Sequence, residues 1–138
     1  MSDKHTPTIL IIDDDEDIAR AMSIRLGSLG YDCVTAHDGE AGLERFHRGG
    51  IDLVITDVNM PRRSGFDVGE TIWKVSDVPI IFITGFVENY PPFRSGEGGI
   101  SFVFKPIDWK HLLHLVEAKL AVRDAGTARS RANAFRGA

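Results

Sequence analysis

Carboxylates, a hydroxyl and an amine stand directly behind the short apolar runs of this sequence. Three consecutive acids, Asp13, Asp14 and Asp15, follow the first run. Later runs are followed by further polar residues, namely Thr56-Asp57, Thr84 and Lys105-Pro106. One such residue alone is typical of a turn or a helix N-cap. Their joint occurrence behind several runs instead predicts one shared site.

The apolar runs are predicted to be strands that are buried on both faces. Four of them are clear: Ile9–Ile12, Leu53–Ile55, Ile80–Ile83 and Phe102–Phe104. A fifth and weaker strand is expected at Asp32–Thr35. Uninterrupted apolar strands are typical of parallel sheets covered by helices on both sides, whereas half-exposed strands alternate. The expected class is therefore α/β.

Helical patterns lie between the predicted strands. Apolar residues recur at helical spacing from Ile18 to Leu29 and end at Gly30, and Asp38 and Asp108 are expected N-caps of later helices. This alternation predicts a doubly wound parallel sheet. In such a sheet the ligand crevice lies beyond the carboxyl ends of the strands. The polar residues behind the strands are thus predicted to meet.

The three acids Asp13, Asp14 and Asp57 would repel one another in a common cleft. A hard divalent cation removes this conflict, and Mg²⁺ fits because it combines one or two carboxylates with water and phosphate oxygens. Lys105 is then placed to neutralise a phosphoryl oxygen and Thr84 to donate a hydrogen bond to another. The sequence predicts Mg²⁺ together with phosphoryl chemistry.

These motifs together resemble the receiver domain of response regulators in two-component signalling. The similarity rests on Ile9–Asp15, Asp52–Pro61, Ile80–Thr84 and Lys105-Pro106, and it extends from about Thr8 to Ala121. We therefore expect a five-stranded, flavodoxin-like sheet in the order 2-1-3-4-5, since the acids must be neighbours at the topological switch point. The resemblance also implies the following roles: Asp57 as phosphoacceptor; Asp13, Asp14, Asp57 and the Asn59 backbone carbonyl as Mg²⁺ ligands; Thr84 and Lys105 as readers of the phosphoryl group; and Phe102 as the switch aromatic.

The function implied by the resemblance is a phosphorylation-dependent signalling switch. It would take its phosphoryl group from a sensor histidine kinase or a histidine phosphotransfer protein, and then bind a downstream protein target. Such a domain catalyses only its own phosphorylation and dephosphorylation and is otherwise not an enzyme. A cytoplasmic location is expected, and the resemblance also allows a homodimer.

Other readings of the same residues remain open at this point. A phosphatase of the haloacid dehalogenase type would use Asp13 as nucleophile and Asp15 as general acid. It needs a further acidic pair after Lys105, where Asp108 stands alone. A pseudo-receiver would keep the fold without being phosphorylated, although every residue needed for the chemistry is present.

A flavin or nucleotide carrier is a further alternative with the same strand order. Carriers of this kind cradle phosphate in a loop rich in Gly, Ser or Thr after the first strand. Here that loop is acidic.

Length and charge set the expected organisation. The chain has 138 residues, a net charge of −4 and one cysteine, Cys33, which is expected to be buried. We expect a stand-alone receiver over residues 1–122 and a basic, flexible tail over 123–138. No apolar run is long enough for a membrane span, and the acidic body predicts no nucleic-acid binding by this domain.

The segment from Gly85 to Gly99 departs from the resemblance. A fourth helix belongs there, but Pro91, Pro92 and several glycines interrupt any helical pattern. The expectation is an irregular or shortened fourth helix.

Overall fold

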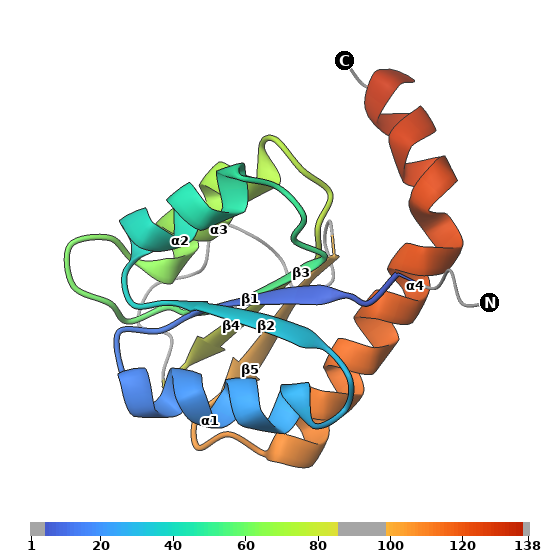
Figure 1. Cartoon of the computed structure of the whole chain (residues 1–138). Coiled ribbons are helices and arrows are strands. Elements are labelled where there is room, and N and C mark those ends of the chain that lie inside the picture. The colour runs from blue at the N-terminus through green and yellow to red at the C-terminus, as the bar shows by residue number, and fades with distance from the viewer. Residues whose placement is uncertain (1–4, 86–98, 137–138) are drawn as a thin grey trace.

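The computed structural model describes residues 5–85 and 99–136, the last part (123–136) by its backbone alone. Strands and helices alternate along the described chain as far as Thr84 (Figure 1). In chain order they are β1 Thr8–Ile12, α1 Glu16–Gly27, β2 Asp32–Ala36, α2 Gly39–His47, β3 Leu53–Asp57, α3 Gly65–Trp73, β4 Ile80–Thr84, β5 Ile100–Phe104 and α4 Trp109–Arg136. The predicted irregular fourth helix between Gly85 and Gly99 lies outside the described residues.

All five strands are parallel and lie in the order β2-β1-β3-β4-β5. The predicted doubly wound sheet and its strand order are therefore confirmed. Ile12 at the end of β1 pairs with Thr56 of β3, and Asp57 pairs with Ile83 of β4. This register places the residues that follow β1 and β3 next to each other.

The sheet separates two hydrophobic cores, because neighbouring side chains of a strand point to opposite faces. On β1, Leu10 and Ile12 face α2 and α3, whereas Ile9 and Ile11 face α1 and α4. All four of these side chains are completely buried. Figure 1 shows the two pairs of helices on opposite sides of the sheet. The uninterrupted apolar runs thus result from burial on both faces.

Polar side chains cap the helices where they begin. Asp15 accepts hydrogen bonds from the backbone N–H groups of Asp17 and Ile18, and Asp38 accepts one from Ala41. Asp108 accepts one from the His111 N–H at 3.3 Å. The expected N-caps Asp38 and Asp108 are confirmed, and Asp15 is a third N-cap.

Helix α1 ends earlier than the predicted end at Gly30. Its last residue is Gly27 with Ser28 as C-cap, whereas Gly30, at φ 97°, lies in the following turn. Cys33 on β2 is half-buried rather than buried. Strand β2 lies at the edge of the sheet, so its side chains are covered less completely.

Helix α4 continues far beyond the sheet (Figure 1). The predicted division between residues 122 and 123 falls inside this helix, so no change of secondary structure marks it. Residues 123–136 are rich in Ala and Arg, which favour helix, and Gly126 is the only strong helix breaker among them. The domain boundary itself stays a prediction. Within the described residues, no helix combines the length and the apolar character that a membrane crossing requires.

Candidate metal centre

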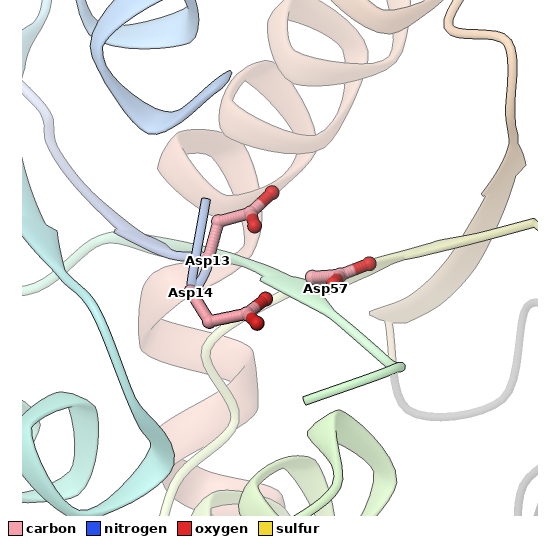
Figure 2. A group of neighbouring side chains, drawn as sticks. All are labelled: Asp13, Asp14 and Asp57. Atoms are coloured by element: carbon pink, nitrogen blue, oxygen red, sulfur yellow. The ribbon is translucent and has the colours of Figure 1, made fainter. Parts of the chain in front are cut away.

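Three carboxylates meet at the carboxyl edge of the sheet. Asp13 follows β1 and is 1% exposed, and Asp57 is the last residue of β3 and is 3% exposed. Asp14 is exposed beside them. One carboxylate oxygen of each residue lies within 4.8 Å of the other two. Figure 2 shows the three side chains together at this edge. The sequence-predicted acidic cluster is therefore present in the structure.

The two buried carboxylates are only partly satisfied by the protein. Asp13 Oδ1 accepts a hydrogen bond from the Asp15 N–H at 2.9 Å. Among the described residues, Asp13 Oδ2 and Asp57 Oδ1 accept no hydrogen bond. Lys105 Nζ lies 3.1 Å from Asp57 Oδ1 and forms an ion pair with it. The pair provides a positive charge but does not have the geometry of a hydrogen bond. Buried oxygens of this kind are costly unless something binds them.

The electrostatics of the cluster oppose ionisation. Burial raises the pKa of Asp13 to about 6, against the hydrogen bond from the Asp15 N–H, while the charge of Asp57 adds to the rise. Burial also raises the pKa of Asp57, and the Lys105 ammonium opposes this rise. One ammonium cannot compensate three carboxylates, so the cluster calls for additional positive charge.

The donor set fits Mg²⁺. Hard carboxylate oxygens are its preferred protein ligands, and the exposed side of the cluster leaves room for water and phosphate oxygens. Asn59 lies in the loop after β3, and its side-chain Oδ1 accepts a hydrogen bond from Thr84 Oγ1 at 3.4 Å. The contribution of its backbone carbonyl stays a prediction.

Thr84 and Lys105 reach the same edge from the neighbouring strands. Thr84 ends β4 and is fully buried, and Lys105 follows β5. The Lys105 N–H donates to the Thr84 carbonyl at 2.8 Å, which ties the two strand ends together. The structure thus brings both residues to the edge of the sheet that carries the acids, and Lys105 into direct contact with Asp57.

Phe102 lies on the opposite side of β5 from Val103 and packs inward. Its ring stacks on Phe82, with centroids 5.5 Å apart, and meets the edge of Phe66 at 6.2 Å. The side chain is partly buried against the core under α2 and α3. Its predicted role as a switch stays a prediction.

Two features of the site were not predicted. His37, just after β2, has its Nδ1 3.4 Å from the Asp13 carbonyl oxygen, a contact that no spacing in the sequence signals. A groove of about 350 Å³ also opens beside Lys105, with Asp17 and Trp109 among its lining residues. Its apolar part consists of Ile18, Ala21, Pro106 and Ile107. The groove lies between α1 and the loop before α4. These segments are far apart in the sequence, so the groove could not be predicted from it.

The structure weighs against the phosphatase alternative. Asp15, which would be the general acid of such a phosphatase, instead caps α1, and Asp108 caps α4. Neither carboxylate joins the cluster formed by Asp13, Asp14 and Asp57.

The sequence matches the response regulator receiver domain family over residues 9–117, and the chain belongs to this family. Domains of this family act as phosphorylation-dependent switches in two-component signalling, and this is the functional class of the chain. The predicted resemblance is thereby confirmed.

Two curated relatives show how far the similarity extends. A probable transcriptional regulator ycf27 of Guillardia theta is 39% identical over 113 residues, which are 81% of this chain and 44% of that protein. The transcriptional regulatory protein DltR of Streptococcus agalactiae is 32% identical over 93% of this chain and 56% of its own length. The chain thus spans about half the length of these relatives.

Solved structures agree with this assignment. A response regulator receiver protein from Pseudomonas putida has a TM-score of 0.75 at 30% identity, covering 83% of this chain and 98% of that one. The response regulator TrrA from Thermotoga maritima, solved in complex with Mg²⁺-BeF, has a TM-score of 0.69 at 33% identity and covers 83% and 99% of the two chains.

Proposed function

We propose that this chain accepts a phosphoryl group on Asp57 in a Mg²⁺-dependent reaction. The observation that carries the proposal is the cluster of three carboxylates, in which Asp13 and Asp57 each keep a buried oxygen without a hydrogen bond. The contact of Lys105 with Asp57 supports it further. A phosphoryl group and a divalent cation together would satisfy all of these groups.

In the proposed reaction a carboxylate oxygen of Asp57 attacks the phosphorus of a phosphohistidine. An O–P bond forms while the P–N bond breaks, and the leaving imidazole takes up a proton from solvent. Mg²⁺ held by Asp13, Asp14, Asp57 and the Asn59 carbonyl would neutralise charge on the transferring group. Lys105 contributes its ammonium, and the Thr84 hydroxyl exchanges its bond to Asn59 for one to the phosphoryl group.

The phosphodonor is a sensor histidine kinase or a histidine phosphotransfer protein. The apolar groove beside Lys105 supports a protein donor, because Ile18, Pro106 and Ile107 line it together with Lys105, which contacts Asp57. We assign this groove to the protein that carries the donor histidine. The chain has a net charge of −4, and we assign this domain no nucleic-acid contact of its own. Transcriptional control belongs to the named relatives, which extend beyond the matched part.

Intact-mass spectrometry with phosphoramidate and Mg²⁺ tests the assignment of Asp57. The unchanged chain should gain one phosphate, and Asp57→Asn should gain none. Asp32→Asn is the matched control, since Asp32 is exposed at the start of β2. A chelator should abolish labelling of the unchanged chain. Equal labelling of Asp57→Asn would refute the phosphoacceptor.

Ile18→Glu tests the donor groove separately. Labelling by phosphoramidate should be unchanged, because a small donor does not use the groove. Phosphotransfer from a phosphorylated histidine phosphotransfer protein that labels the unchanged chain should slow at least about tenfold, since a buried charge in an apolar contact is costly. Transfer at the original rate would exclude the groove as docking site.

A further inference from the structure

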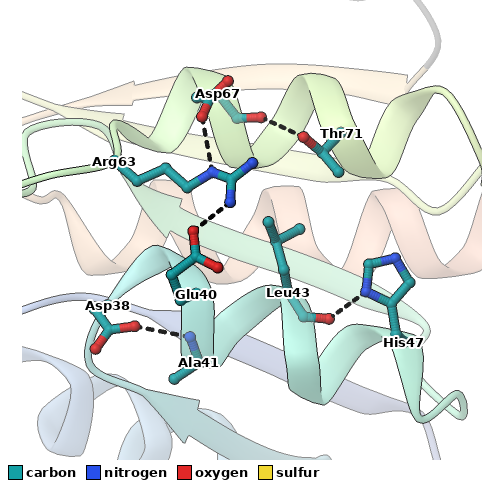
Figure 3. Close-up of polar contacts among 8 residues, drawn as sticks. All are labelled: Asp38, Glu40, Ala41, Leu43, His47, Arg63, Asp67 and Thr71. Carbon is teal, nitrogen blue, oxygen red and sulfur yellow. Dashed lines mark hydrogen bonds and ion pairs between the residues drawn. The ribbon is translucent and has the colours of Figure 1, made fainter.

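Arg63 joins three parts of the fold: the loop that follows Asp57, helix α2 and helix α3. It lies in the loop between β3 and α3, behind Asp57 and Asn59. Its Nε donates to Asp67 Oδ2 of α3 at 2.7 Å, and its Nη1 donates to Glu40 Oε1 of α2 (Figure 3). The side chain is only 27% exposed, although it is an arginine on a loop. Such a placement is typical of a structural bridge rather than of a free surface charge.

The arginine stem is part of the same joint. A Cβ added to Gly39 would lie 3.1 Å from Arg63 Cβ and 2.9 Å from a methyl group of Val68. The first turn of α2 therefore rests directly on the loop and on α3, and only a residue without a side chain fits there. The bridge combines tight packing with two charge-assisted hydrogen bonds.

The two ends of the loop are held in different ways. At its base the Gly65 N–H donates to the Val58 carbonyl at 2.9 Å, and a Cβ on Gly65 would lie 2.0 Å from the Asp57 carbonyl oxygen. The base is thus fixed by backbone packing. Towards α2, a second and weaker ion pair has Arg62 Nη2 3.9 Å from Asp38 Oδ2. Arg63 is therefore the stronger tie between this loop and α2.

We propose that Arg63 is a positioning residue for the metal centre: its bridge to Glu40 and Asp67 holds the loop that carries Asn59 in place for Mg²⁺ binding. The inference rests on the proposed function, because the loop matters to the metal only through Asn59 and Asp57. Groups that orient metal ligands typically change metal affinity when they are removed. For a bridge that acts through a loop, the expected effect is about fivefold, below the range for direct partners of a ligand.

Electrostatics and positioning predict opposite signs for the removal of Arg63. A guanidinium near a cation site repels Mg²⁺, so removing its charge would by itself strengthen Mg²⁺ binding. Loss of positioning weakens Mg²⁺ binding instead. Arg63→Met separates the two effects because it keeps most of the apolar stem against Gly39 but loses both hydrogen bonds.

Calorimetric titration with Mg²⁺, without any phosphodonor, is the decisive measurement. Arg63→Met should raise the dissociation constant about fivefold, and Arg63→Lys should restore part of the affinity because it can still reach one carboxylate. Phosphoramidate labelling at limiting Mg²⁺ should slow in parallel. Affinity equal to or tighter than that of the unchanged chain would overturn the proposal.

Two glutamates of α2 provide the matched controls. Glu40 pairs with Arg63, whereas Glu44 pairs with Arg48 on the same helix at 2.8 Å. Glu40→Gln and Glu44→Gln remove the same charge, so equal effects on Mg²⁺ affinity would mean general electrostatics and would also overturn the proposal. If Glu40→Gln weakens Mg²⁺ binding more than Glu44→Gln does, the proposal is supported. Glu40→Gln also keeps the contact between Arg63 and Asp67, so it can be tested even if Arg63→Met fails to fold.

The failure of the proposed function would look different. If the unchanged chain bound no Mg²⁺ and took up no phosphate, the metal centre itself would be wrong, and the role of Arg63 would be refuted together with it. If the unchanged chain binds Mg²⁺ and Arg63→Met binds it equally well, only the positioning role is wrong.

Discussion

Within one or two residues at the ends of β1 and β3, burial changes from stabilising the fold to destabilising it. Ile9 to Ile12 of β1 are completely buried, and Asp13, directly behind them, is 1% exposed. On β3, Ile55 is likewise completely buried, and Asp57 at the end is 3% exposed. The degree of burial is the same, but its consequence is opposite. Apolar side chains gain free energy by leaving water, whereas carboxylates with unsatisfied oxygens lose it.

This difference shows that burial in one molecule serves two purposes. The interior of the sheet supplies the free energy of folding. Its carboxyl edge uses part of that free energy to hold charged groups ready for a cation and a phosphoryl group. Substitutions on either side of this boundary should therefore change stability in opposite directions.

The largest loss of stability is expected for Phe82→Ala. Phe82 is completely buried on β4 and packs against Phe66 and Phe102. A large cavity here should lower the free energy of unfolding by about 3–5 kcal/mol in urea titrations. Val75→Ala is the control, because Val75 is 67% exposed and should change little. A loss below about 1 kcal/mol would mean that the core repacks around the deletion.

At the edge, Asp13→Asn should stabilise the metal-free protein. Burial raises the pKa of Asp13 to about 6, well above the usual value for an aspartate, so at neutral pH folding holds the carboxylate ionised where burial disfavours it. Removing the charge should raise the free energy of unfolding by about 1–3 kcal/mol. The same variant should lose most of its Mg²⁺ affinity. Lower stability in Asp13→Asn would contradict the comparison between interior and edge.

The pH dependence of stability should show that the Asp13 carboxyl group is the source of the stability gained in Asp13→Asn. Below pH 3.8 the carboxyl group is protonated in the folded and the unfolded chain, so it carries no penalty. As the pH rises through about 6 the folded chain is forced to ionise it, and stability is lost. The stability difference between Asp13→Asn and the unchanged chain should therefore grow from about pH 4 to 7 in urea titrations with a chelator. A constant difference would exclude titration as the cause.

The smallest effect is expected in the loop after β3. Arg62 has a φ of 67°, in the left-handed region that favours glycine. Arg62→Gly should raise the free energy of unfolding by about 0.5 kcal/mol, since relief of strain outweighs the added freedom of the unfolded chain. Arg63→Gly next to it should instead lower stability, because it removes the bridge to Glu40 and Asp67. Thermal unfolding of both variants would show whether the strain lies at position 62.

Features determined by neighbouring residues could be predicted from the sequence. The N-caps Asp38 and Asp108 depend only on where a helix starts, and they are found as expected. The strand order followed from the requirement that Asp13 and Asp57 meet. These inferences depend on local patterns and on the rule that parallel strands share their carboxyl edge.

Features that depend on packing between distant segments could not be predicted. The bridge from Arg63 to Glu40 requires α2 to lie against the loop after β3. The periodicity of the sequence does not predict this contact. His37 beside Asp13 depends on how the chain leaves β2. The continuation of α4 to Arg136 was missed for another reason: helix propensity persists there although no apolar stripe does.

Under the proposed function, the parallel pairing of β1 with β3 links magnesium to the lifetime of the protein. Asp13 and Asp57 lie far apart in the sequence, and the pairing of β1 with β3 brings them together only in the folded chain. The unfolded chain therefore has no site for the cation. By mass action, each tenfold rise of Mg²⁺ above its dissociation constant should add about 1.4 kcal/mol to the free energy of unfolding. Proteases that cut only unfolded chains would then degrade this protein more slowly as magnesium becomes more abundant.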